Sequence, residues 1–255
     1  MSRFSPLWRW GGGALLLIWF VLPLLPIMLW SLADRWPTGD LLPTWGLVGW
    51  REAYGDHMVP ALLRSTVLGL IVAAIAVPIG ALAGRALGWQ IGGRHPWSAA
   101  LLLAPIALPP FALAMGLDVL LLRLHIPQPV AVVVLLTVFA VPYTTYIVRS
   151  AYAGLDSQIE DQARMLGASA TQATRKVTLP AIAPALWAAA AMAFLVGWSD
   201  YVITLIIGGG RLVTAPILVA ASASGTGNEP LTSALAVAVA LPLVAALLIG
   251  RLVRR

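Results

Sequence analysis

Two carboxylates lie within long apolar segments of the chain, where an ionised side chain is costly. Asp118 comes late in one such segment, and Asp200 comes late in another, within the stretch GWSDY at 197–201. Because acids inside a membrane usually line a pathway or pair with a base, both are candidates for contacting a cation in transit. The rings of Trp198 and Tyr201 could add a cation–π surface beside Asp200.

Each of these candidates has a structural alternative. Asp118 could instead pair with Arg123 or Arg64 near the membrane edge, and we favour this interpretation. For Asp200, pathway lining and structural pairing are equally open. The glycine run Gly208–Gly210 could form an anion-binding nest, but such runs are more often simple turns, which we favour here.

The sequence offers no catalytic constellation. His57, His95 and His125 are isolated. The sequence shows no nucleophile paired with a base and no His/Asp/Glu spacing typical of a metal site. The phosphate-binding pattern GxxxxGK[ST] does not occur, and the chain has no cysteine for a disulfide or a thiolate metal site. The net charge of +6 comes from basic residues scattered at the ends of apolar segments, which is not a nucleic-acid signature. We therefore expect no enzyme activity, no nucleic-acid binding and no cofactor bound by this chain.

A polar stretch, residues 156–180, separates two long apolar segments and carries clear helix signals. Ser157–Glu160 has the S-x-x-E form of a capping box, and the helix it opens is expected to stop at Gly167. Ser169–Gln172 is a second box, opening a helix expected to end near Pro180. These signals predict two short helices joined at a glycine, forming a compact elbow outside the bilayer that docks a partner.

Within this stretch, Asp161-Gln162-Ala163 is followed by Gly167 and then by Val177-Thr178-Leu179-Pro180. This arrangement resembles the EAA loop of bacterial ABC importer permeases, whose pattern is E-A-A, three residues, G, nine residues, I-x-L-P. In that family the loop is a coupling helix that sits in a groove on the ATPase subunit. The alternative interpretation of this stretch is an ordinary amphipathic loop between membrane helices. Three positions differ from the family pattern, and the spacing is intact. Asp161 stands where the pattern has Glu and has a shorter side chain, Gln162 stands where it has the first Ala, and Val177 stands where it has Ile. The resemblance implies that the ATPase-coupling residues are Glu160, Asp161, Ala163, Gly167, Leu179 and Pro180.

The composition places these features in a membrane protein. The chain of 255 residues is 60% hydrophobic and 10% charged, and its mean hydropathy is +0.90, which excludes an ordinary soluble globule. The first apolar run contains prolines and lacks an A-x-A site, so we interpret it as a retained helix, not a signal peptide. Prolines within the later runs predict bent helices packed round a pathway. We predict one all-α transmembrane domain over 1–255, with about six spans at 12–32, 62–83, 99–122, 130–148, 182–206 and 233–253.

The basic residues set the orientation. Eleven of the sixteen Lys and Arg residues fall on one side if both termini and the elbow lie inside. Because cytoplasmic loops carry the positive excess, the elbow and both termini are predicted to be cytoplasmic, with 33–61 and 207–232 as outside loops.

The resemblance implies a type I ABC importer transmembrane domain in the bacterial inner membrane. It implies two ATP-binding subunits holding ATP and Mg, a second permease subunit (homo- or heterodimer), and a periplasmic substrate-binding protein. The stretch 194–211 resembles the polyamine-type branch, which is similar to those for thiamine and iron, so the expected solute is a polyamine or similar cation. The alternatives are an ATP-independent secondary transporter or channel subunit, and an integral-membrane enzyme.

Overall fold

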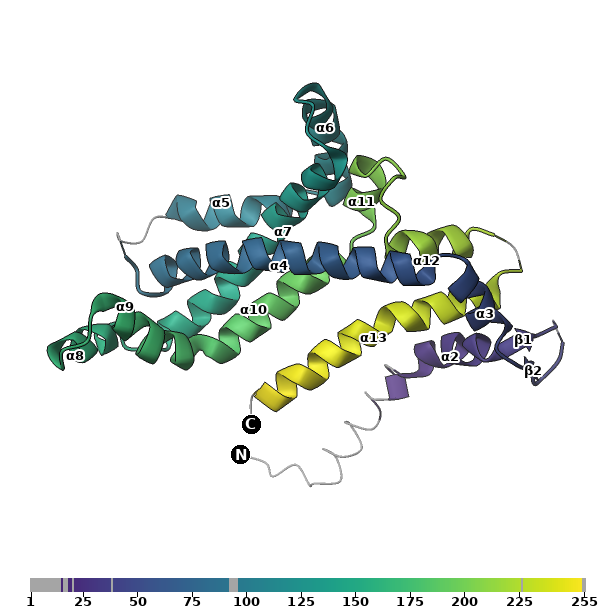
Figure 1. The fold of residues 1–255 in the computed structure, drawn as a ribbon, viewed down its shortest axis with the longest axis horizontal. Helices are drawn as coiled ribbons and strands as arrows, with labels where there is room; N and C mark the ends of the chain where they lie inside the picture. The colour runs from purple at the N-terminus through teal and green to yellow at the C-terminus, as the bar shows by residue number, and fades with distance from the viewer. Residues whose placement is uncertain are drawn as a thin grey trace. The chain divides into compact units, whose positions relative to one another are not determined.

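The computed structural model describes residues 15, 18–19, 21–37, 39–91, 96–225 and 227–253 (Figure 1). These form two compact units. One contains the described residues up to Pro60 together with Leu218–Leu241, and the other contains Ala61–Ile217 together with the described residues from Pro242 onward. The predicted span 12–32 falls partly outside the described residues, and His95 falls wholly outside them.

The described part of the chain is helical apart from one two-stranded hairpin. Its elements are η1 (Leu22–Leu24), α2 (Leu25–Ser31), β1 (Ala33–Arg35), β2 (Thr44–Trp45), α3 (Val48–Gly55), α4 (Met58–Gly88), α5 (Pro96–Ala107), α6 (Pro110–Arg123), α7 (Gln128–Ala153), α8 (Ile159–Met165), α9 (Ala170–Ala173), η2 (Thr174–Thr178), α10 (Leu179–Ser199), α11 (Val202–Ile207), α12 (Ala215–Ala223) and α13 (Glu229–Val253).

The hairpin and α3 lie in the segment predicted as an outside loop at 33–61, for which no element was predicted. β1 and β2 pair antiparallel, and the Thr44 hydroxyl closes the pair by donating to the Arg35 carbonyl at 3.0 Å. The Asp34 carboxylate accepts from the Val48 N–H at 2.9 Å, which satisfies a free donor at the start of α3. The segment is therefore ordered by its own polar contacts.

Helix α4 packs closely against α7 through a row of glycines. Gly80, Gly84 and Gly88 recur every four residues, so they share one helix face. A Cβ at Gly84 would stand 2.9 Å from the backbone nitrogen of Arg149, and one at Gly88 would stand 2.9 Å from the Arg149 carbonyl. Small residues spaced in this way let two helix backbones approach within a membrane.

A second close approach brings α4 against α10. A Cβ at Gly197 would stand 2.8 Å from the Cα of Gly69, so these two glycines face each other directly. The largest buried cluster surrounds this contact and is built from α4, α6, α7, α10 and α11, with Leu68, Val72 and Leu136 among its members. The core of this unit is thus formed by residues far apart in the sequence.

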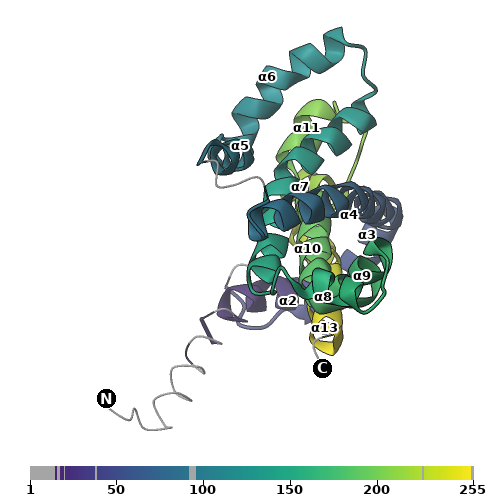
Figure 2. The same ribbon diagram turned by 90° about the vertical axis from the view of Figure 1, so that its left-hand side faces the viewer.

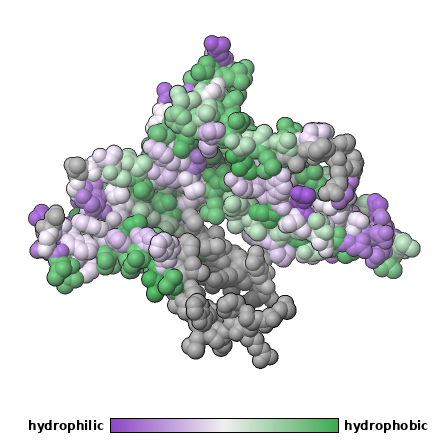
Figure 3. Space-filling view, turned by 180° about the vertical axis from the view of Figure 1, so that it is seen from behind, coloured by the Kyte–Doolittle hydropathy of each residue, from purple (hydrophilic) through white to green (hydrophobic). Residues whose placement is uncertain are grey.

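The opposite face of α4 presents large apolar side chains to the surroundings. Leu63, Val67, Leu70 and Ile75 are all exposed, and apolar residues cover much of the surface seen in Figure 3. A helix with small residues inside and large apolar residues outside is suited to lipid, because lipid solvates apolar side chains. In the described part of the chain, three helical stretches are long and apolar enough to cross a membrane: Met58–Gly88, Gln128–Ala153 and Ala170–Ser199.

The predicted span 99–122 is not one straight helix. The chain breaks at Leu108 and Pro109 between α5 and α6, and the two helices are bent by 96° (Figure 2). Proline lacks an N–H and clashes with the preceding turn, so the adjacent Pro109 and Pro110 interrupt the helix. The prediction of a bent helix is confirmed here, and the bent pair still counts as a candidate for one span, so the span at 99–122 stays a prediction.

Among the described residues, the span candidates number three, or four if the bent pair counts as one span. The apolar stretches Leu22–Ser31 and Glu229–Pro242 are each shorter than a full crossing, and the second is the first part of α13, which continues to Val253. The figure of six spans stays a prediction.

Candidate functional site

The elbow predicted at 156–180 is present, and lies where α7 ends and α10 begins (Figure 1). It consists of α8, α9 and the π-helical turn η2. The predicted capping box at Ser169 is confirmed: the Gln172 N–H donates to the Ser169 hydroxyl at 3.3 Å, and the Ser169 N–H donates to the Gln172 side chain at 2.9 Å. The start of the second helix is therefore fixed by its own side chains.

Gly167 ends α8 as predicted, and its φ of +92° lies in the region that L side chains rarely adopt. Its N–H donates to the Arg164 carbonyl at 2.9 Å, and the next N–H, of Ala168, donates to the Ala163 carbonyl at 3.1 Å. This pair of bonds is a complete Schellman motif, which satisfies the last carbonyls of α8. The backbone itself fixes the angle between α8 and α9.

The first predicted capping box is wrong. The helix begins at Ile159, and neither Ser157 nor Glu160 serves as a cap. The Asp156 carboxylate accepts from the Gln158 N–H at 2.9 Å and its carbonyl accepts from the Ile159 N–H at 3.2 Å, so the chain enters α8 through a turn set by Asp156 and not through a Ser157 cap. Glu160 is thereby released for contacts elsewhere.

The second helix was predicted to end near Pro180, and this prediction is wrong. It continues from α9 through η2 into α10, and Pro180 sits in the first turn of α10. In η2 the Leu179 N–H donates to the Thr174 carbonyl, five residues back. The wider π turn changes the backbone hydrogen-bond pattern immediately before Pro180, which has no N–H to donate. The helix therefore continues through a proline that would normally interrupt it.

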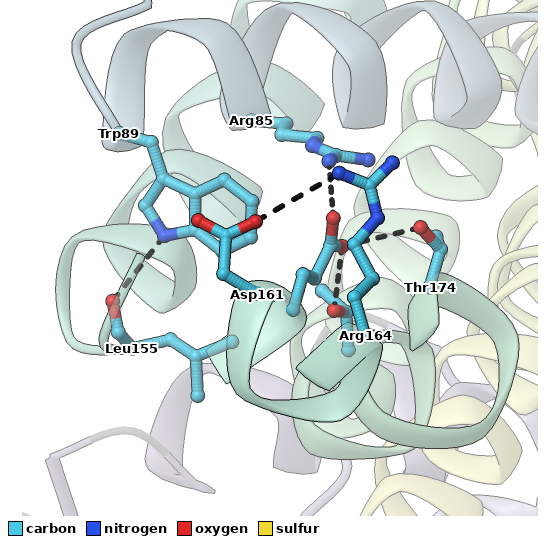
Figure 4. A network of polar contacts seen from close by, with 8 residues as sticks. Arg85, Trp89, Leu155, Asp161, Arg164 and Thr174 are labelled. Carbon is cyan, nitrogen blue, oxygen red and sulfur yellow. Dashed lines mark hydrogen bonds and ion pairs between the residues drawn. The ribbon is translucent and has the colours of Figure 1, made fainter. Parts of the chain in front are cut away.

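Glu160 of α8 forms hydrogen bonds with α4 and with η2, through partners that include Arg85 and Thr174, labelled in Figure 4. Its Oε2 accepts from Arg85 Nη2 of α4 at 2.7 Å. Its Oε1 accepts from the hydroxyls of Thr174 and Thr178, at 3.2 Å and 2.7 Å, at the two ends of η2. Its side chain is only 14% exposed, so a costly buried charge is compensated by an ion pair and two further donors.

The end of α4 is held to the same region by a second residue. Trp89 donates its ring N–H to the Leu155 carbonyl at 3.2 Å, directly after α7. The Arg85 guanidinium lies 5.0 Å from the Trp89 ring, whose edge meets Tyr152 of α7. Neither Arg85 nor Trp89 was predicted as a site residue, although a basic and an aromatic residue four apart at the end of an apolar helix are a recognisable interface signal.

The outer side of α8 has the opposite character. Asp161 is 73% exposed and lies 3.8 Å from Arg164, in a weak exposed pair. Met165 and Leu166, at the tip before the glycine turn, are 88% and 90% exposed. Adjacent carboxylates thus have different roles: Glu160 faces the protein, and Asp161 faces outward beside an uncovered apolar tip.

The remaining predicted coupling residues are placed by the elbow's geometry. Ala163 is half-buried and supplies the carbonyl that closes the Schellman motif. Leu179 and Pro180 are exposed at the start of α10. The structure therefore brings Ala163 and Gly167 into one turn and leaves Leu179 and Pro180 beyond η2.

The predicted pathway residues lie in different environments, and their role in a pathway stays a prediction. Asp200 accepts from the backbone N–H and the hydroxyl of Thr204, both at 2.8 Å, and so caps the start of α11. Trp198 is 1% exposed and stacks on Phe194 at 5.6 Å, so its ring is not on a surface of this chain. Tyr201 is exposed.

Asp118 is half-buried on α6, and in the described part of the chain it forms no ion pair with Arg123 or Arg64. Arg64 instead donates to the Val213 carbonyl at 3.3 Å. The pairing favoured from the sequence is therefore wrong. The described residues also contain no group of three or more His, Asp or Glu side chains that could hold a metal.

The glycine run after α11 is a turn, as favoured from the sequence. Gly209 and Gly210 have φ values of +55° and +74°, and the Arg211 N–H donates to the Gly208 carbonyl at 3.0 Å. A hollow of about 590 Å³ lies beside this turn, next to the residues that join α6 to α7.

Comparison with known proteins gives the family. Residues 96–255, which include the elbow, match the model of the binding-protein-dependent transport system inner membrane component. The chain belongs to this family. It is a membrane-spanning permease component of an ABC importer, in a family of permeases and not of enzymes.

The permease is similar to several transport proteins. It is 29% identical over 202 residues to the trehalose transport system permease protein SugB of Mycobacterium tuberculosis, covering 76% of this chain and 73% of that protein. It is 26% identical over 202 residues to the spermidine/putrescine permease PotC of Haemophilus influenzae, covering 78% of each. It is 26% identical over 263 residues to the putative 2-aminoethylphosphonate permease PhnV of Salmonella typhimurium, covering 100% of this chain and 98% of that protein.

A solved structure shares the fold. The permease matches a chain of a bacterial ABC transporter involved in the import of the acidic polysaccharide alginate, with a TM-score of 0.65 and 16% identity over 98% of both chains. The architecture is therefore that of a helical type I ABC importer permease in a multi-pass membrane protein.

Proposed function

We propose that this permease couples to a cytoplasmic ATPase through the 156–180 elbow. The supporting observation is the uncovered apolar tip, Met165 and Leu166, on a turn whose angle is fixed by the Gly167 Schellman motif. Exposed apolar side chains on a rigid element are suited to insertion into a partner's groove, because little ordering entropy is lost on binding. The charged pair of Asp161 and Arg164 flanks the tip and could fix its register.

In this proposal the permease works within a larger assembly. Two ATPase subunits, holding ATP and Mg, bind the elbows of this chain and of a second permease, which is another copy or a sibling. A periplasmic binding protein delivers the solute to the opposite side. ATP-driven closure rocks the helices between inward- and outward-facing states, with both termini in the cytoplasm and the chain in the bacterial inner membrane.

For the solute, we propose a polyamine or similar small cation. The sequence support is the stretch 194–211 with its acid, Asp200. Similar permeases are named for a sugar, polyamines and an aminophosphonate, so overall similarity does not choose among these classes. Because Asp200 caps α11, its availability to a cation is the specific point to test.

The coupling proposal is tested by purifying the permease from its native membrane in mild detergent. Wild type is compared with an Asp161→Asn, Gly167→Val double variant and with Ser157→Ala as the matched control, because Ser157 lies in the elbow but caps nothing. We expect a P-loop ATPase to co-purify with wild type and with Ser157→Ala, and to be lost from the double variant.

Retention of the ATPase by the double variant would remove the elbow from the interface. Absence of any ATPase from the wild-type preparation would favour the alternative, an ATP-independent secondary transporter or channel subunit.

A further inference from the structure

The elbow is joined by the chain to α7 and α10, but its contact with α4 is entirely non-covalent. Arg85 and Glu160 are 75 residues apart in the sequence, yet their side chains meet at 2.7 Å. Any movement of the elbow therefore reaches α7 and α10 through the backbone, whereas it can reach α4 only through contacts between side chains and packed surfaces.

The packing between α4 and α7 offers few directional contacts near this end. At Gly84 and Gly88 the α4 backbone lies directly against the α7 backbone and the first side-chain atoms of Val148 and Tyr152, so this contact is steric. The directional contacts come from the next residues, because Arg85 binds Glu160 and Trp89 binds the Leu155 carbonyl. Charge-assisted hydrogen bonds are shorter and stronger than neutral ones, so the Arg85 contact is the stiffest of these.

We propose that Glu160 is a positioning residue that ties the cytoplasmic end of α4 to the elbow, so that movement imposed on the elbow by a partner is passed to α4. This rests on the proposed coupling function. The carboxylate of Glu160 is bound by Arg85, Thr174 and Thr178 and is nearly buried, so it is occupied within the permease and does not itself contact the partner.

The two threonines extend the link to α10. Thr174 and Thr178 bind the same carboxylate oxygen from the two ends of η2, and Thr178 is fully buried. One side chain thus joins α8, the π turn that leads into α10, and the end of α4. Two adjacent residues of α8 thus face different ways: Glu160 faces α4, and Asp161 faces the side proposed to meet the ATPase.

The test measures the distance between the end of α4 and the elbow. The chain contains no cysteine, so spin labels can be placed at Gln90→Cys and Thr171→Cys, both exposed, without removing any native thiol. The distance distribution is recorded for the full-length permease with its co-purified ATPase in nanodiscs, without nucleotide and trapped with ATP and vanadate. The variants are Glu160→Gln, Thr178→Val, the charge swap Arg85→Glu with Glu160→Arg, and Arg149→Gln as a control for loss of a nearby cation.

In wild type and in Arg149→Gln we expect one narrow distribution in both nucleotide states, because α4 and the elbow move together. Losing the charged acceptor raises the population of detached elbow about tenfold, so Glu160→Gln broadens the distribution and makes it respond to ATP. Thr178→Val produces a smaller change in the same direction, and the charge swap restores the narrow distribution in part. The restoration separates a specific link from general loss of structure.

A Glu160→Gln distribution identical to wild type in both states would overturn the proposal. So would broadening that the charge swap leaves uncorrected while the membrane yield is normal. If no ATPase co-purifies with wild type, the proposed function fails, and the link is judged separately from the nucleotide-free permease. In the nucleotide-free permease, an unchanged distance distribution in Glu160→Gln overturns the proposed link between α4 and the elbow, and a broadened distribution supports it.

Discussion

Replacing Gly167 by Val gives the sharpest test of the elbow's geometry. The φ of Gly167 is +92°, and a Cβ built there meets nothing within 4 Å. The substitution therefore acts through the backbone alone, with no side-chain clash. A positive φ costs an L-residue about 1–2 kcal/mol, and we take about 2 kcal/mol for a β-branched residue.

The expected effect is a large local change within an intact fold. About 2 kcal/mol shifts a local equilibrium roughly 30-fold, since 1.4 kcal/mol is a factor of ten, whereas whole domains are stable by about 5–15 kcal/mol. The matched control is Gly154→Val, because Gly154 lies just before the elbow with an ordinary φ of −89° and has only normal contacts, at 3.7 Å, for a Cβ. Membrane insertion should be normal in both variants.

Limited trypsin digestion in inside-out vesicles measures this change, with Arg164, Arg175 and Lys176 as the exposed cleavage sites in the elbow. When opening is fast relative to cleavage, the cleavage rate follows the population of the open form. We expect the rate for Gly167→Val to rise roughly 30-fold over wild type, and that for Gly154→Val to change little. Equal cleavage rates for the two variants would refute the argument from backbone conformation.

Three further predictions follow from the same structure. Ser169→Ala should weaken the elbow by about 1 kcal/mol through loss of its cap, whereas Ser157→Ala should have no effect in the same digestion assay. Asp200→Asn should preserve α11, since Asn caps as well as Asp, but should lower uptake of a cationic solute; unchanged uptake would remove Asp200 from the pathway. Gly84→Leu should force α4 away from α7 at a cost of about 1–3 kcal/mol or more, which should reduce the yield of monodisperse protein in size-exclusion chromatography. Gly116→Leu, where the space is open, should leave that yield unchanged.

The parts of the elbow that could be predicted from the sequence depend on residues within one turn of each other. Gly167 ends α8 because its own backbone conformation demands it, and Ser169 caps α9 through a partner three residues away. The Ser157 prediction was wrong for an equally local reason, because Asp156 forms the turn through which the chain enters α8. Local chemistry gives strong signals, but two adjacent signals can conflict.

The contacts that could not be predicted join residues distant in the sequence. The partner of Glu160 lies on α4, and no local pattern indicates which of the scattered arginines meets it. Asp118 shows the reverse case, since a plausible nearby base does not pair with it. The bend before α6 was foreseeable from Pro109 and Pro110, but its angle depends on the packing of α6 in the folded unit.

The π turn at Thr174–Thr178 gives a reason for the fixed spacing between Gly167 and Pro180. The stretch from Ala170 to Ser199 is a continuous helix of 30 residues, about 45 Å long at 1.5 Å per residue. Each residue of an α-helix turns the following side chains by about 100°. Deleting one residue from the α-helical part of this segment, Ala170–Ala173, would leave the elbow still attached and the helix almost as long, yet it would rotate every side chain of α10 about the helix axis. The π turn holds one residue more than an α turn, so a deletion within it would become an ordinary α turn with little rotation of α10. The number of residues in this segment therefore sets the rotational phase of α10 relative to the elbow, more than it sets a distance.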